Sequence, residues 1–180
     1  MRARPFAPRR RTSLTKDDDL LVRFARRLAN WEEPLSVDEL QKREFRARDG
    51  GPDLFPSVYE VASRDQTVQA CAEHSTMFDP DRTTLGVDAT DAANTTRKTE
   101  GNPAFAFIRE HHREVVLQDV DELRVFISDL TANLSERRHV VAKADVLAYA
   151  KTRLREADRE WEAALNADGA KSWLRKLRPR

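Results

Sequence analysis

The residues best suited to metal binding or nucleophilic chemistry are one cysteine and four histidines: Cys71, His74, His111, His112 and His139. Cys71 and His74 have the Cys-x-x-His spacing that places two side chains on one face of a helix. A zinc ion needs four ligands, or three and a water, and the remaining histidines lie far along the chain. Cys71 and His74 are therefore weak metal candidates, and the sequence predicts no metal site and no cofactor.

Two other near-motifs lack their second half. Glu136 and His139 have the Glu-x-x-His spacing of di-iron bundles, which need two such motifs and two further glutamates. Asp79 and Asp81 begin like a calcium loop, but the required Gly and Glu do not follow. The sequence contains no phosphate-binding glycine loop and no nucleophile elbow. We therefore expect no catalytic residue and a non-enzymatic protein.

Composition restricts the class of protein further. Charged residues make up 35% of the 180 residues and hydrophobic residues 39%, and there are 5 glycines, which favours solvated helices over sheet. The single cysteine permits no internal disulfide, which fits a reducing compartment. No apolar run approaches the roughly 20 residues of a membrane span, and no secretory signal is visible. We expect an intracellular protein, in the cytoplasm or, given its Arg-rich start, the mitochondrion.

Charge is distributed unevenly along the chain. Residues 1–16 carry a net +6, residues 168–180 carry +4, and residues 17–167 therefore carry −9 within a total of +1. Basic ends of this kind suit phosphate or an acidic protein surface, whereas the acidic middle should repel both.

Capping signals and apolar periodicity predict a helical first half. Residues 1–14 form an extended basic arm, because prolines and arginines exclude a packed helix there. A helix follows between Thr15 and Pro34, with Leu20, Leu21, Phe24, Leu28 and Trp31 at helical spacing and Arg23 on the opposite face. Ser36 with Glu39, and Ser57 with Glu60, are capping-box pairs that predict two more helices. The first of these should stop at Gly50–Gly51 and the second near Met77, so that 15–77 is an N-terminal helical part.

The second half is predicted to be helical after a long loop. Residues 78–102 are rich in Thr, Asp and Asn, and are interpreted as a linker, a flexible tether or a strand that wraps a partner. Asn102–Pro103 opens a C-terminal helical part at 103–167, and Asp119 with Glu122 opens a helix within it. The last helix should run over 135–167, followed by a basic tail at 168–180.

The predicted long helix carries a heptad pattern. Val140, Leu147, Leu154 and Trp161 are seven residues apart, and mostly alanines lie three residues after each. Such a seam packs against another helix. The partner helix is either in the same chain, as an internal hairpin, or in another molecule, as a coiled coil.

Taken together, the sequence predicts a mainly α fold, a helical bundle or hairpins with a long C-terminal helix, a basic N-terminal arm and a long central loop. The favoured function is a structural or assembly subunit of a larger intracellular complex, with other protein subunits as partners. The alternative is a nucleic-acid-binding protein, in which the arms contact phosphate and Trp173 stacks on a base. The predicted partner-binding residues are Arg9, Arg10, Arg11, Leu147, Leu154, Trp161, Trp173, Arg175, Lys176 and Arg178.

Overall fold

The fold is a five-stranded antiparallel sheet with helices on both faces. The computed structural model describes residues 20–26, 36–76, 82–88, 95–97, 105–132 and 141–178. The strands are β1 Leu20–Arg26, β2 Ser57–Val61, β3 Arg82–Asp88, β4 Thr95–Arg97 and β5 His112–Val115. The helices are α1 Val37–Glu44, α2 Arg64–Ser75, α3 Ala106–His111, α4 Val120–Ala132, α5 Lys143–Arg155, α6 Arg159–Asn166 and α7 Ser172–Arg175. The strand order is β3-β1-β2-β5-β4, and every neighbouring pair is antiparallel.

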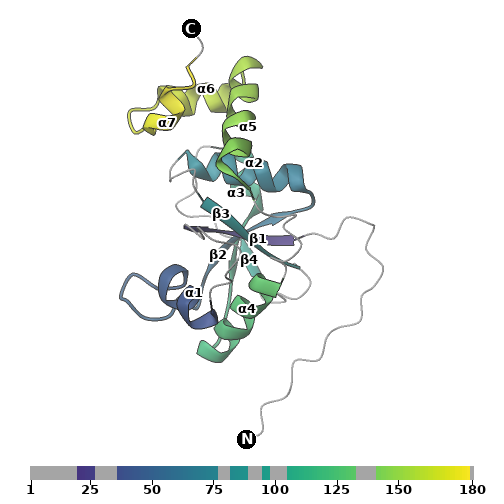
Figure 1. The fold of residues 1–180 in the computed structure, drawn as a ribbon, viewed down its shortest axis with the longest axis vertical. Coiled ribbons are helices and arrows are strands. Elements are labelled where there is room, and N and C mark those ends of the chain that lie inside the picture. The colour runs from purple at the N-terminus through teal and green to yellow at the C-terminus, as the bar shows by residue number, and fades with distance from the viewer. Residues whose placement is uncertain are drawn as a thin grey trace, which may run out of the picture.

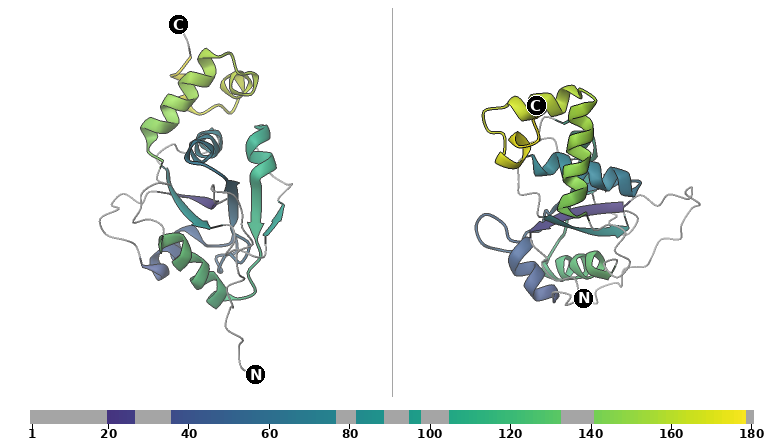
Figure 2. Two further views of the ribbon diagram at one scale, coloured as in Figure 1. Left: turned by 90° about the vertical axis from the view of Figure 1, so that its right-hand side faces the viewer. Right: turned by 45° about the horizontal axis from the view of Figure 1, so that its top comes forward.

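The two faces of the sheet carry separate hydrophobic cores. Figures 1 and 2 show α2, α3 and α5 on one side of the sheet, with α6 and α7 beyond α5, and α1 with α4 on the other side. Along β1, Leu20, Val22 and Phe24 face the first core, and Leu21 faces the second. A strand alternates its side chains between faces, so the interior strand β1, which is covered on both faces, needs apolar residues at successive positions.

Strand β1 lies where a helix was predicted between Thr15 and Pro34. The prediction was wrong for residues 20–26, because a contiguous apolar run satisfies helical spacing and a strand buried on both faces equally well. Pairing with β2 and β3 on its two sides decides in favour of the strand. The remainder of that predicted helix, and the arm at 1–14, lie outside the described residues.

Two of the predicted helix starts are confirmed. The Ser36 hydroxyl accepts from Glu39 N while the Glu39 carboxylate accepts from Ser36 N, and α1 follows directly. Glu122 N donates to Asp119 Oδ1 at the start of α4. Local hydrogen bonds of this kind join residues three apart, so a sequence pattern can indicate them.

The helix start predicted at Ser57 was wrong, and so was the loop predicted at 78–102 for residues 82–88 and 95–97, while the rest of that loop lies outside the described residues. Ser57–Val61 is β2, whose β-branched and aromatic residues suit a strand. Helix α2 begins later, after Ser63, whose side chain accepts from Gln66 N. Within the predicted loop, Arg82–Asp88 and Thr95–Arg97 form strands β3 and β4 at the two edges of the sheet. Helices still outnumber strands in the described chain, so the mainly helical prediction is confirmed only in this broad sense.

The long helix predicted over 135–167 is two helices in the described part, 141–167. α5 ends at Arg155, Ala157 adopts the left-handed region with φ of 56°, and Asp158 caps α6 through its side chain. The left-handed residue turns the chain and ends α5. The chain therefore folds back, and α6 packs on the same core as α5 instead of extending it.

The heptad residues on α5 and α6 contribute to the chain's own core, and Val140 lies outside the described residues. Trp161 is 1% exposed, with its ring centroid 5.0 Å from that of Phe105 and 6.0 Å from that of Tyr149. Leu154 is buried and Leu147 is half-buried. The internal alternative is the one observed, because Leu154 and Trp161 leave almost no surface for a foreign helix.

Trp161→Ala should lower the free energy of unfolding by about 3–5 kcal/mol, because it leaves a large cavity between α3, α5 and α6. Val125, which is 61% exposed on α4, supplies the control, and Val125→Ala should change it by less than about 0.5 kcal/mol. Urea unfolding monitored by circular dichroism measures both. Equal stabilities for the two variants would contradict the packing described for Trp161.

Candidate functional site

A largely buried arginine, with 16% of its side chain exposed, connects three segments on the α1/α4 side of the sheet. Arg23, on β1, donates from Nη2 to Glu44 O at 2.6 Å and from Nη1 to Ser57 O at 2.9 Å. Its guanidinium carbon lies 4.5 Å from the centroid of the Phe45 ring, and Nη2 is 3.9 Å from Asp53 Oδ2. A single side chain thus joins the end of α1, the loop after it and the start of β2.

The environment of Arg23 keeps it charged despite its burial. Burial lowers the pKa of the guanidinium from its usual value, whereas the nearby Asp53 and Glu44 carboxylates raise it. Arginine stays protonated in proteins even when its pKa falls. The two acids therefore serve as counter-charges to Arg23.

The loop between α1 and β2 is a compact, hydrogen-bonded hairpin. Ala47 N donates to Gly51 O at 2.9 Å, Gly50 N donates to Ala47 O at 3.0 Å, and Asp53 N donates to Phe45 O at 2.9 Å. Gly50 has a φ of +89°, which a residue with a side chain rarely adopts. These bonds and Arg23 give the loop a defined shape, and Figure 1 shows it projecting beside α1.

The outer surface of this segment is cationic. We use the name basic loop for residues 42–55, in which four cations, Lys42, Arg43, Arg46 and Arg48, are exposed. Asp49 is the exposed carboxylate among them, and it accepts from Gly51 N. Glu44 and Asp53 are half-buried near Arg23. The acids of the segment are largely turned inward, so positive charge dominates its surface.

An exposed aromatic ring stands at the base of the basic loop. The Phe55 side chain is 53% exposed, between the half-buried Leu54 and the buried Pro56. Leu117 N donates to Leu54 O at 3.0 Å and Val115 N donates to Pro56 O at 3.1 Å. Backbone hydrogen bonds hold the residues before and after Phe55. The position of the Phe55 backbone is therefore fixed, while its side chain remains exposed to solvent.

The predicted basic tail folds back onto the chain. Trp173 Nε1 donates to Ser75 O at 3.1 Å, so the indole is half-buried against α2. Arg175 donates to Asp168 O and Arg178 donates to Asn166 Oδ1, although both residues remain exposed, as does Lys176. The structure therefore places the predicted tail cations on the surface and uses Trp173 for packing. Arg9, Arg10 and Arg11 lie outside the described residues.

The metal candidates are part of the first core. Cys71 is buried, and His74 Nδ1 lies 2.9 Å from the Tyr59 hydroxyl oxygen. Within the ranges that the structure describes, no group of three or more His, Cys, Asp or Glu side chains is arranged to hold a metal ion. The Cys-x-x-His spacing thus brings together a core thiol and a hydrogen-bonded imidazole.

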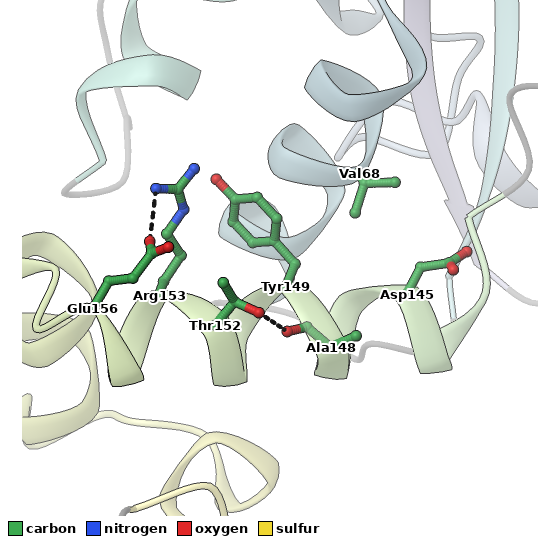
Figure 3. A pocket seen from close by; sticks show the side chains of 7 residues that line it. All are labelled: Val68, Asp145, Ala148, Tyr149, Thr152, Arg153 and Glu156. Atoms are coloured by element: carbon green, nitrogen blue, oxygen red, sulfur yellow. Dashed lines mark hydrogen bonds and ion pairs between the residues drawn. The ribbon is translucent and has the colours of Figure 1, made fainter.

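A shallow hollow of about 330 Å³ lies between α2 and α5 (Figure 3). Its polar lining groups already bond to one another or to neighbours. Asp145 pairs with Arg64 at 3.2 Å, Arg153 pairs with Glu156 at 3.3 Å, and Thr152 Oγ1 donates to Ala148 O. The hollow does not place a nucleophile beside a base among its lining residues.

A buried glutamate lies deeper in the same helical layer. Glu73 on α2 is 2% exposed, and its Oε1 accepts from Gln69 Nε2 at 2.9 Å. Burial, together with the negative charges of Glu160 and Asp158, raises the pKa of the Glu73 carboxyl to about 7, although the bond from Gln69 and the Ile108 backbone N–H lower it. This carboxyl is therefore neutral in a substantial fraction of molecules near pH 7.

The sequence pattern contained a signal for the basic loop that was interpreted too narrowly. Gly50–Gly51 was used only as a helix stop, whereas it is the turn of a hairpin flanked by four cations. The anchor, Arg23, was placed on the outer face of a helix. Finding it required the long-range pairing of β1, which local spacing does not contain.

Comparison with protein-family models, with curated proteins and with solved structures finds no match to this chain. Among the described helices, none is long and apolar enough to cross a membrane.

Arg23→Met should lower the free energy of unfolding by about 2–4 kcal/mol. The substitution removes the donor to the carbonyls of Glu44 and Ser57 and the counter-charge of Asp53. Exchange of the Gly50 and Asp53 amide hydrogens should also accelerate. Urea unfolding and hydrogen–deuterium exchange measure the two effects. The control is Arg64→Met, which breaks an exposed ion pair worth less than about 1 kcal/mol. If both variants behaved alike, Arg23 would not be the anchor.

Glu73 should make stability depend on pH. A carboxyl whose pKa rises from 4.5 to about 7 on folding binds more protons in the folded state, so stability falls as pH rises through this window. Between pH 5 and pH 8, the loss should be roughly 2 kcal/mol, and Glu73→Gln should abolish it. Urea unfolding of both proteins at the two pH values tests this. An unchanged pH dependence in Glu73→Gln would refute it.

Proposed function

We propose that this chain is a non-enzymatic subunit of a larger intracellular assembly, and that it docks on a polyanionic surface through the basic loop. The observation that carries the proposal is the anchored segment itself, which presents Lys42 and Arg43 on the last turn of α1 and Arg46 and Arg48 on the hydrogen-bonded hairpin that follows. A preformed loop loses little conformational freedom on binding, so more of its contact energy appears as affinity.

Charge placement supports a directional contact. Arg23 engages Asp53 and the carbonyl of Glu44 beneath the loop, which keeps positive charge dominant on its outer surface. The body at 17–167 carries a net −9 and would be repelled by a polyanion. The chain should therefore approach such a surface with the basic loop first. The exposed tail cations Arg175, Lys176 and Arg178 offer a second contact.

The double charge reversal Arg43→Glu/Arg48→Glu should weaken binding of the full chain to heparin, used here as a model polyanion. Removing two contacts between cations and the polyanion should reduce the magnitude of the slope of log K against log salt concentration by about two. Elution salt from a heparin column, followed by a titration at several salt concentrations, measures both quantities.

The matched control is Lys151→Glu/Arg155→Glu, which changes net charge equally at two exposed positions of α5. It should elute close to the unmodified chain. In native cell extracts, the unmodified chain and this control should elute with larger complexes on gel filtration. The Arg43→Glu/Arg48→Glu variant should elute as the free chain. Equal losses for the two double variants would mean that net charge alone drives binding, and the proposal would fail.

A further inference from the structure

We propose, on the basis of the proposed docking function, that the polyanion is a single-stranded nucleic acid, with its phosphates on the cations of the basic loop and one base stacked on Phe55. The inference starts from the joint exposure of a large aromatic ring and four cations in one structured segment of fourteen residues, 42–55.

Electrostatic attraction between the basic loop and a polyanion does not account for the exposed side chain of Phe55. It is 53% exposed, although the carbonyls of its neighbours Leu54 and Pro56 accept from Leu117 N and Val115 N at the end of β5. Leu54, by contrast, is half-buried against the second core. An exposed aromatic ring in the same segment as exposed cations is suited to stacking on unpaired bases.

The cations suit phosphate. Three of the four are arginines, whose planar guanidinium groups donate two parallel hydrogen bonds to an oxyanion. Arg46 is oriented by its bonds from Nε and Nη2 to Gly50 O, at 3.4 and 3.2 Å. Its position opposite Pro52 in the hairpin fixes the side of the loop from which it extends.

The ring also distinguishes between polyanions. An acidic protein surface offers carboxylates to the arginines but no planar group that needs Phe55. Duplex nucleic acid offers phosphates, but its bases are already stacked on one another. A single strand supplies both an accessible base face and a flexible phosphate backbone that can follow the hairpin.

The test measures fluorescence anisotropy of a labelled oligothymidylate of about 12 nucleotides bound to the full chain. Phe55→Ala should weaken binding about tenfold, because loss of a base stack costs on the order of 1–3 kcal/mol. Phe55→Trp should restore or strengthen binding, since a larger ring stacks at least as well. The control is Val125→Ala, which truncates another exposed apolar side chain, on α4, and should have no effect. Circular dichroism verifies that each variant is folded.

Two competitors separate this inference from the proposed function. Unlabelled duplex of the same length and polyglutamate should each displace the oligothymidylate poorly. If polyglutamate or duplex binds as well, and Phe55→Ala has no effect, the base-stacking inference is overturned while docking through the basic loop stands. If Arg43→Glu/Arg48→Glu leaves the affinity for every polyanion unchanged, both the inference and the proposed function are overturned.

Discussion

The largely buried cation of Arg23 is the constraint on which the organisation of this side of the molecule depends. Placing a guanidinium beneath a loop is unfavourable unless its charge and donors are matched. Here the guanidinium donates hydrogen bonds to Glu44 O and Ser57 O, lies near the Asp53 carboxylate and packs over the Phe45 ring. Those groups come from three segments, so the contacts of one side chain connect the end of α1, the hairpin and the start of β2 to the sheet.

The same interaction links stability to the proposed function. The carboxylate of Asp53 accepts from Phe55 N at 3.1 Å and lies 3.9 Å from Arg23, so it is half-buried while the cations of the basic loop are exposed. The opposite face of the sheet has a different character. There α5, α6 and α7 close over Trp161 and Leu174, and the polar groups of the hollow between α2 and α5 bond to one another. Both helical layers enclose a packed core, and the proposed binding surface lies on the α1/α4 side.

How much of the fold the sequence could predict depended on how far apart in the sequence the interacting residues lie. The Ser36 capping box and the Asp119 start of α4 depend on residues three apart, and both were confirmed. β1 was mistaken for a helix, because its apolar run fits both periods and only pairing with β2 and β3 decides. Ala157 gives no local signal for the left-handed turn that divides the predicted long helix. The candidate site was missed for the same reason, since Arg23 is 34 residues from Ser57 and becomes meaningful only when the strands are paired.

The central claim is that the basic loop, held by Arg23, is where a polyanion binds. Amide chemical shifts of the isotopically labelled chain, followed during titration with a single-stranded oligonucleotide, test it most directly. The account predicts that the shifts that change first and most belong to residues 42–55 and their contacts at 115–117. Changes confined to the tail at 171–178, or spread evenly over all exposed cations, would contradict it.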